Sequence, residues 1–395
     1  MIKSIYVDNF KALNNFQMEL ESFTVIVGNN MSGKSTVLQA LDFIANMAKE
    51  DFGVILERRG WKVSDLKSQM QKSPKITIIC NLELIIKNEL LPVRWEIQIL
   101  AYTQKNIMEL SHETVEIYGE GKEKVLLSYT QSKGGFIWDG SVQEAVTLPK
   151  LQTNSSVLKM MDVTEFPVLQ ALKMFLVNSD SFEMLSPEKM RLSSRGDVNT
   201  IGNAGEKLPS FVKSMNQKQK AEFIDKIKLA LGEKIVNVDA RTKGKPGWTH
   251  LVTEEQYRKK SLMIESKNMS DGTLRLLAFL AICEMDKRGM MLLDEIENGI
   301  NLDYAEKIVR ILEDNCNRKS SQMIVTTHSP IFLDYVEKES IRYMYREPQF
   351  GNCKCNSLAE IPELNEKMRY LYPGELFMNM SNNDIIKILL AEEDA

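Results

Sequence analysis

Apolar and polar residues alternate along the first part of the chain in a pattern that predicts strands. Two such runs, residues 2–10 and 16–27, flank a turn-like polar segment at 11–15. Further strand-like runs follow, separated by polar turns, at 76–86, 93–100, 107–117 and 125–130. The first part of the chain is therefore predicted to hold a mostly antiparallel β lobe.

Helical spacing begins after the first pair of strands. Residues 35–49 place their apolar side chains on one stripe of an amphipathic helix. The stretch 155–231 is also predicted to be mostly helical, most clearly at 168–177 and 218–231. From 268 to 330 the pattern runs helix, buried strand, helix, buried strand, as an α/β core requires. Heptad runs of useful length are missing, so we expect no long coiled coil.

These patterns together predict an α/β fold in three segments. Residues 1–150 would form the first part of the α/β core with its antiparallel lobe, and 151–260 a mainly helical inserted lobe. Residues 261–395 would complete the core.

Composition limits the environment and the partners. A chain of 395 residues with 43% hydrophobic residues can bury one large core or two modest ones. Its net charge of −4 means that any contact with DNA must come from a local patch. We find no apolar run of about 18 residues and no signal-peptide core. The five scattered cysteines fit a reducing compartment. A cytoplasmic location is therefore predicted.

The segment from Gly28 to Ser35 fits the pattern G-x-x-x-x-G-K-[ST] between a predicted strand and a predicted helix. Such a loop turns backbone N–H groups onto phosphate oxygens, and the helix N-terminus adds its positive dipole end. Lys34 would place a charge on the β- and γ-phosphates, and the Ser35 hydroxyl would bind Mg²⁺. An ordinary glycine-rich turn has no evident need for a lysine and a serine at these positions. The expected ATP-binding residues are Gly28, Asn29, Asn30, Met31, Ser32, Gly33, Lys34, Ser35 and Thr36.

Two carboxylates, Asp294 and Glu295, end a short apolar run at 290–293. Such a run predicts a buried parallel strand, and binding sites form at the carboxyl ends of parallel strands. Asp294 would hold Mg²⁺, and Glu295 would orient or activate the water that attacks the γ-phosphate. Without the Gly28–Ser35 loop, a strand followed by an exposed acidic turn would be an equally good interpretation.

Two further elements gain meaning from their positions. Ser270 precedes an apolar helix, and Gly272 follows within its first turn. As an isolated feature this is an N-cap, but it stands shortly before the acidic strand. His328 ends another apolar strand, 323–327, where an imidazole could bond the γ-phosphate. A lone histidine is more often structural; its place beside the other elements favours a role with the nucleotide.

These elements in this order resemble the ABC ATPases, in the RecF/SMC/OLD-like branch and not the transporter cassettes. Residues 8–13 are similar to that branch's opening motif, which touches adenine. Residues 268–276 resemble the ABC signature, Asp294-Glu295 the Walker B motif, 297–299 the start of the D-loop and 326–330 the switch-histidine region. The chain also resembles stand-alone AAA family ATPases with a Ser-Asp-Gly-Thr signature, which occur in bacterial anti-phage defence modules.

The resemblance implies an ABC-type P-loop ATPase head that hydrolyses ATP to ADP and phosphate, slowly and under regulation. Ser270 and Gly272 would then contact the ATP held by the P-loop of a second subunit, so that ATP joins two heads into a homodimer or a larger oligomer. ATP binding closes such a dimer and hydrolysis opens it. OLD-type nucleases add a TOPRIM domain, but the stretch after His328 is too short for one. A separate effector protein is therefore expected.

The sequence departs from the family pattern at two points. Asp271 stands where the signature usually has a glycine, so this carboxylate either points away from the nucleotide or slows hydrolysis. The glutamine of a Q-loop has no clear position, although Gln69 and Gln71 lie in a suitable region.

Basic residues leave a second function open. Arg241, Lys243 and Lys245 mark a predicted hairpin tip, which is either a solvated surface or a contact for DNA phosphates. The chain is thus predicted to be the sensor or scaffold of a defence system that works with a nuclease-like effector. The alternative is a RecF-like DNA-repair ATPase, and a transporter motor fits least.

Overall fold

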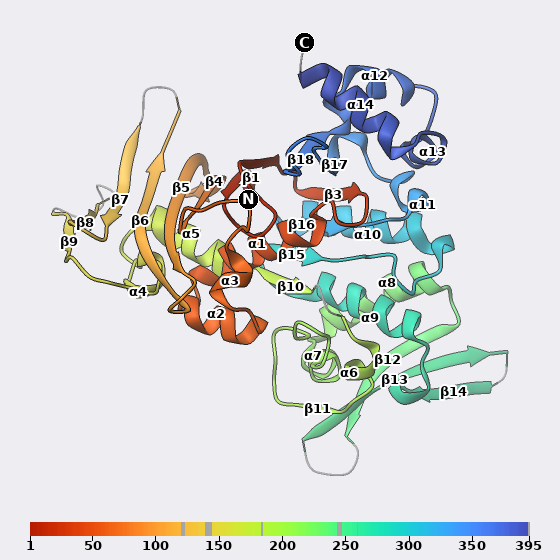
Figure 1. Cartoon of the computed structure of the whole chain (residues 1–395). Helices are drawn as coiled ribbons and strands as arrows, with labels where there is room; N and C mark the ends of the chain where they lie inside the picture. Colours follow the sequence, from red (N-terminus) through yellow and green to blue (C-terminus); the bar gives the residue numbers. More distant parts are fainter. Residues whose placement is uncertain (120–122, 139–143, 183–184, 243–246, 259, 394–395) are drawn as a thin grey trace.

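The structure is a computed structural model that describes residues 1–119, 123–138, 144–182, 185–242, 247–258 and 260–393 (Figure 1). Three sheets organise the chain. The first is an eight-stranded antiparallel sheet in the order β2-β1-β4-β5-β6-β7-β8-β9. Its strands are β1 (Ile2–Asp8), β2 (Phe16–Glu19), β4 (Lys75–Ile86), β5 (Glu89–Tyr102), β6 (Ile107–Ile117), β7 (Lys124–Thr130), β8 (Gly134–Ile137) and β9 (Val146–Leu148).

A six-stranded sheet forms the centre of the molecule in the order β10-β15-β16-β3-β17-β18. Neighbouring strands are parallel except for the last pair, β17 and β18. Because its first five strands share a direction, their carboxyl ends meet at one edge of the sheet. The strands are β3 (Phe23–Gly28), β10 (Asp180–Phe182), β15 (Met290–Leu293), β16 (Gln322–Thr326), β17 (Ile341–Arg346) and β18 (Cys353–Ser357).

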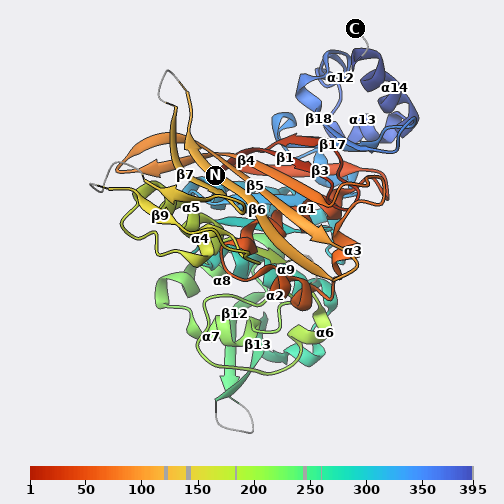
Figure 2. The same ribbon diagram turned by 60° about the vertical axis from the view of Figure 1, so that its left-hand side comes forward.

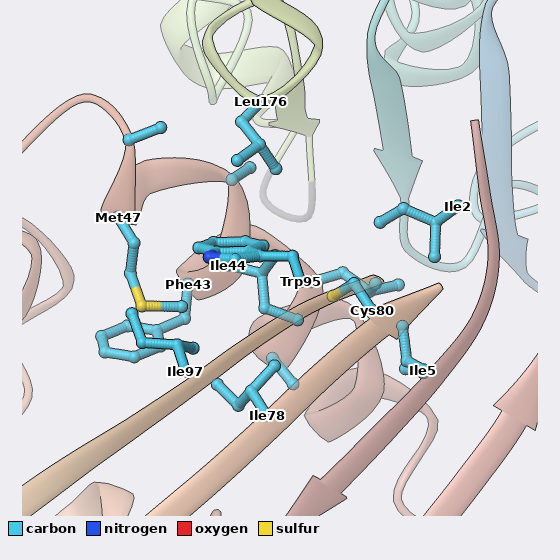
Figure 3. Packing of buried hydrophobic residues seen from close by; sticks show 14 of the residues in the cluster. Ile2, Ile5, Phe43, Ile44, Met47, Ile78, Cys80, Trp95, Ile97 and Leu176 are labelled. Atoms are coloured by element: carbon cyan, nitrogen blue, oxygen red, sulfur yellow. The ribbon is translucent and has the colours of Figure 1, made fainter. Parts of the chain in front are cut away.

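One hydrophobic cluster lies between these two sheets and is built around helix α1 (Lys34–Met47). Figure 3 shows Phe43, Ile44 and Met47 of α1 packed around Trp95 of the antiparallel sheet, with Leu176 contributed by α5 (Pro167–Val177). Trp95 is fully buried, so the antiparallel lobe is packed against the face of α1. The short helices α2 (Phe52–Arg59), α3 (Val63–Leu66) and α4 (Val157–Met160) also lie on this side (Figure 2).

A second cluster covers the opposite side of the central sheet. It draws on α7 (Leu208–Ser214), α8 (Gln217–Leu231), α9 (Asp271–Glu284) and α10 (Ala305–Lys319). Beside these helices lies the third sheet, with α6 (Pro187–Met190) nearby in the lower part of Figure 1. Its strands are β11 (Ser194–Arg195), β12 (Ile235–Thr242), β13 (Trp248–Tyr257) and β14 (Lys260–Glu265).

The chain ends in a small helical group at the other end of the molecule (Figure 1). It consists of α12 (Pro362–Lys367), α13 (Pro373–Asn379) and α14 (Asn382–Glu393), and α13 packs on α11 (Pro330–Leu333). In the described part of the chain, the longest helices, α8 and α10, have 15 residues each, and no helix is long and apolar enough to cross a membrane.

The predicted α/β fold with an antiparallel lobe is confirmed, and two details differ from the sequence reading. The run 16–27 is two strands, because the chain leaves the antiparallel sheet after β2 and enters the central sheet as β3. The segment 151–260 holds β10, a strand of the central sheet, and most of the third sheet besides its helices. The proposed limits at 150 and 260 stay a prediction.

Candidate nucleotide site

The predicted P-loop connects β3 to α1 at the carboxyl edge of the central sheet. Gly28 has a φ of +147°, and a Cβ on it would lie 2.0 Å from the carbonyl oxygen of Met344 in β17. Gly33 has a φ of +104°, and its Cβ would meet the sulfur of Cys353 in β18 at 2.7 Å. Both positions therefore need glycine, since the β17–β18 hairpin lies directly against the loop.

The start of α1 is open to an anion. No side chain caps this helix and its first turn carries no acidic residue. The Ser35 side chain lies in this exposed turn, and the buried hydroxyl of Ser32 has no hydrogen-bond partner. An uncapped helix N-terminus and an unpaired buried hydroxyl both offer hydrogen-bond donors, and phosphate oxygens fit as the missing acceptors.

Lys34 lies inside the loop, 6% exposed, and donates to the carbonyl oxygens of Gly28 at 2.8 Å and Asn29 at 2.9 Å. Burial lowers the pKa of Lys34, and the nearby carboxylates, Asp294 foremost, act against that shift. The same interactions place the P-loop lysine and the acidic pair after β15 in one electrostatic environment. Two elements far apart in sequence thus meet, as the motif order predicts.

A threonine that sequence reasoning passed over holds the acidic pair. The fully buried hydroxyl of Thr326, at the end of β16, donates to Asp294 and accepts from the Glu295 N–H at 2.8 Å. Glu295 itself is exposed and has a φ of +48°, a conformation that a non-glycine residue adopts at a cost. Strain of this kind collects at functional sites, which agrees with a chemical role for Glu295.

Glu297 joins the acidic turn to the switch histidine. Its carboxylate accepts from the His328 backbone N–H at 2.5 Å, and its other oxygen is buried without a partner. The His328 side chain is exposed at the carboxyl end of the central sheet, beside the P-loop. Thr326 and Glu297 therefore tie Asp294 and the backbones of Glu295 and His328 to the same edge of the central sheet.

The signature segment begins α9, on the opposite side of the central sheet from α1. The Ser270 hydroxyl caps this helix by accepting from the Thr273 N–H at 3.1 Å, so the N-cap interpretation holds locally. A Cβ on Gly272 would lie 2.1 Å from the carbonyl oxygen of Gly299. The signature and the D-loop thus touch, and Gly272 is needed for that close approach.

The opening motif and the Q-loop candidates include residues that make structural contacts. Asn9 of the opening motif is buried and its amide donates to two backbone carbonyls, of Ser73 and Lys75, at 2.8 Å each. Gln71, one Q-loop candidate, donates to Asp8 at 2.7 Å, while Gln69 is exposed.

The predicted basic hairpin is the antiparallel pair β12–β13. Arg241 is exposed at its end, and Lys243 and Lys245 lie outside the described residues. Its role toward DNA stays a prediction.

Arg346, at the end of β17, is a further residue that the sequence did not point to. Its Nε donates to the Met31 carbonyl at 2.8 Å and so braces the tip of the P-loop, where Met31 has a φ of +64°.

A magnesium ion would find suitable ligands in this site, because the Ser35 hydroxyl and the Asp294 carboxylate are oxygen donors of the kind Mg²⁺ prefers.

A cavity of about 500 Å³ adjoins the first half of the P-loop. Gly28, Asn29 and Asn30 line one side of it, and Thr327 and His328 another. Phe377 and Asn382 of the C-terminal helices close it, next to Tyr343 of β17. Its volume is in the range of small-molecule sites.

Comparison with known proteins agrees with this geometry. A family model described as "AAA ATPase domain" matches residues 1–228, and one described as "AAA domain, putative AbiEii toxin, Type IV TA system" matches residues 168–334. No curated protein matches the sequence.

Among solved structures, the chain resembles the SmcHead bound to the C-winged helix domain of ScpA, with a TM-score of 0.55, 14% identity and coverage of 90% of this chain and 97% of that one. A Smc head domain with an extended coiled coil, bound to the C-terminal domain of ScpA and derived from Pyrococcus furiosus, gives a TM-score of 0.51, 14% identity and coverage of 93% and 99%. At this identity the two structures show a shared fold.

The P-loop, the acidic strand end and the switch histidine meet at one sheet edge, in a head-like fold. Since the first family model spans more than half of the sequence, the chain belongs to the AAA ATPase domain family and is an ATP hydrolase, with a fold that resembles SMC head domains.

Proposed function

We propose that this ATPase works as a Mg-ATP-dependent dimer switch, in which each copy supplies the signature for the ATP of the other. The observation that carries the proposal is the division of the site. The carboxylates that act on Lys34 come from Asp294, Glu295 and Glu297, whereas the signature segment starts α9 on the other side of the sheet. Ser270 and Asp271 are exposed there, in a position to meet a second molecule.

In this proposal the groups of one copy have distinct tasks. The P-loop from Gly28 to Thr36 binds the triphosphate, with Lys34 on the β- and γ-phosphates. Ser35 and Asp294 hold Mg²⁺, which would neutralise phosphate charge. Glu295 orients the attacking water and His328 contacts the γ-phosphate, so that loss of this phosphate loosens the dimer.

The decisive experiment is the size of the Glu295→Gln variant with and without nucleotide. We expect a monomer without ATP and a dimer with Mg-ATP, because the amide keeps the shape of the side chain but cannot act as a base. Light scattering after gel filtration measures this directly. Lys34→Ala in the same background is the matched control and should stay monomeric with ATP. A Glu295→Gln protein that remains monomeric at saturating Mg-ATP would contradict the dimer mechanism.

We further propose that the switch is the sensor or scaffold of a bacterial anti-phage defence system and acts with a separate nuclease-like effector. The family model named for a toxin of a toxin–antitoxin system supports this loosely, and the SMC heads bound to ScpA illustrate an ATPase head that engages a partner protein. The test is phage plating on bacteria that carry this gene with its neighbouring gene. Protection should vanish in Lys34→Ala, and equal plating with and without the gene pair argues against the role.

A RecF-like ATPase that binds duplex DNA remains the second candidate, and the exposed Arg241 at the end of β12 favours it. This function requires that duplex DNA raise the ATPase rate. It also requires that neutralising Arg241, Lys243 and Lys245 together remove the increase and reduce the salt dependence of binding. An ATPase rate that ignores DNA supports the partner-protein function instead.

A further inference from the structure

Asp271 places a carboxylate at the first residue of α9, inside the signature segment. Its side chain is 66% exposed. In the proposed dimer this surface approaches the triphosphate bound by the second copy. A bare carboxylate there would repel the phosphates, and the repulsion would oppose closure of the dimer.

Arg191 meets this carboxylate from a different part of the chain. It follows α6, 80 positions before Asp271, and its guanidinium donates to the Asp271 carboxylate and to the Met269 carbonyl at 2.9 Å. The Ser266 hydroxyl in turn donates to the Arg191 carbonyl at 3.1 Å. The arginine is therefore tied to the segment before α9 and to the helix start itself.

The arginine of this pair is shielded from water, whereas Asp271 is exposed. The Arg191 side chain is 26% exposed, which makes its interaction with Asp271 less screened than that of a fully solvated ion pair. The guanidinium also bridges a side chain and a backbone carbonyl, so it fixes an orientation as well as a charge. Both effects act on the residues that flank Ser270.

We propose that Arg191 is a positioning residue that acts in trans on ATP hydrolysis, by neutralising Asp271 and orienting the signature segment toward the nucleotide of the second copy. The inference deepens the proposed dimer switch and rests on it. It also assigns a reason for the aspartate in this signature, since a paired carboxylate can stand near phosphates without repelling them.

The first test separates neutralisation from a merely structural contact. Arg191→Ala should lower kcat by about 10- to 100-fold, the range for an outer group that orients a contacting one. Asp271→Asn alone should keep most of the wild-type kcat. The double variant, Arg191→Ala with Asp271→Asn, should regain most of the kcat that Arg191→Ala loses, because no bare carboxylate remains. Arg191→Lys keeps the positive charge and preserves the fold. Its kcat should lie between that of the wild type and that of Arg191→Ala.

Arg310→Ala is the matched control, because Arg310 pairs with Glu306 at 2.7 Å on an exposed face of α10. It should leave kcat unchanged. A double variant as slow as Arg191→Ala alone would overturn the neutralising role.

The second test asks whether Arg191 serves its own nucleotide or that of the partner. Arg191→Ala and Glu295→Gln proteins are mixed before ATP is added, and the ADP formed in the first turnover is measured. A mixed dimer then combines an intact P-loop and Glu295 from one copy with an intact signature from the other. An equal mixture should form ADP at about a quarter of all sites, because half of the dimers are mixed and each has one complete site. ADP no greater than the sum of the two separate proteins would overturn the action in trans.

The size of Glu295→Gln with ATP distinguishes the two levels of failure. If this variant does not dimerise, the proposed switch fails and the role of Arg191 fails with it. If it dimerises and Arg191→Ala still has the wild-type kcat, only the role of Arg191 is refuted.

Discussion

Thr326→Val tests how the acidic pair is held, because valine keeps the branched shape of threonine and removes only the hydroxyl. That hydroxyl donates to Asp294 and accepts from the Glu295 N–H at 2.8 Å, and its residue is fully buried. Loss of a hydrogen bond to a charged group and loss of the acceptor of a partly buried N–H together cost about 2 to 4 kcal/mol. Over 395 residues, an unfolding entropy of about 2.1 cal/mol/K per residue converts this to a fall of about 2 to 5 °C in Tm.

The catalytic effect should exceed what the loss of stability explains. With Asp294 free to turn, we expect kcat to fall about 10- to 100-fold and the Mg²⁺ concentration for half-maximal activity to rise. Phosphate release at saturating ATP, measured across a magnesium titration, checks both. Thr326→Ser keeps the hydroxyl and should stay near the wild-type rate.

Thr24→Val provides a matched control within the same sheet. Thr24 is also fully buried, and its hydroxyl accepts from the Glu21 N–H at 2.9 Å at the end of β3 away from the P-loop. This variant should lower Tm somewhat less than Thr326→Val does. It should leave kcat and the Mg²⁺ concentration for half-maximal activity unchanged. If Thr326→Val shows the same pattern as this control, the hydroxyl stabilises the fold only and the reasoning is wrong.

Three further substitutions probe the P-loop. Lys34→Ala should abolish ATP binding in calorimetry while the protein stays folded, since the side chain bonds only loop carbonyls; wild-type affinity would contradict its role. Gly28→Ala should abolish ATP binding and lower Tm, because the new Cβ would clash with backbone. Gly196→Ala is the control, because Gly196 also has a positive φ but an added Cβ would meet open space. It should lower Tm only by the small backbone strain and leave ATP binding intact. Arg346→Ala should raise KM for ATP more than it lowers kcat, because the tip at Met31 loses its brace; an unchanged KM would exclude that function.

Long periodic runs were predictable because local pattern and tertiary pairing agree there. The run 107–117 became β6 with the same limits, and 168–177 became α5 with one more residue. Prediction failed where a neighbour decides the structure. β10 has three residues, too few for a period to show, and is a strand because it pairs with β15. The run 16–27 predicts one strand, but its two halves pair within different sheets.

The site shows the same division. Motif spacing pointed to the groups that would touch ATP, because the P-loop pattern is specific and favours a role for the carboxylates that follow the apolar strand. The residues that hold them carry no such signal. Thr326 works through two hydrogen bonds and Glu297 through one, and only the fold brings these partners together. Arg191 and Asp271 are likewise joined across 80 positions of sequence.

In the proposed dimer switch, the charges of the site give a physical reason to expect poor ATP hydrolysis by one copy alone. The carboxylates of Asp294, Glu295 and Glu297 interact electrostatically with Lys34, and ATP would add several negative charges to theirs. Against these, one copy offers the lysine and the half-charge or so of the α1 N-terminus. Magnesium offsets part of the excess, and the positive N-terminal end of a second α9 can offset more, provided that its own aspartate is neutralised. ATP affinity should therefore depend on both magnesium and protein concentration, and Arg191→Ala should weaken the second dependence while leaving the first in place.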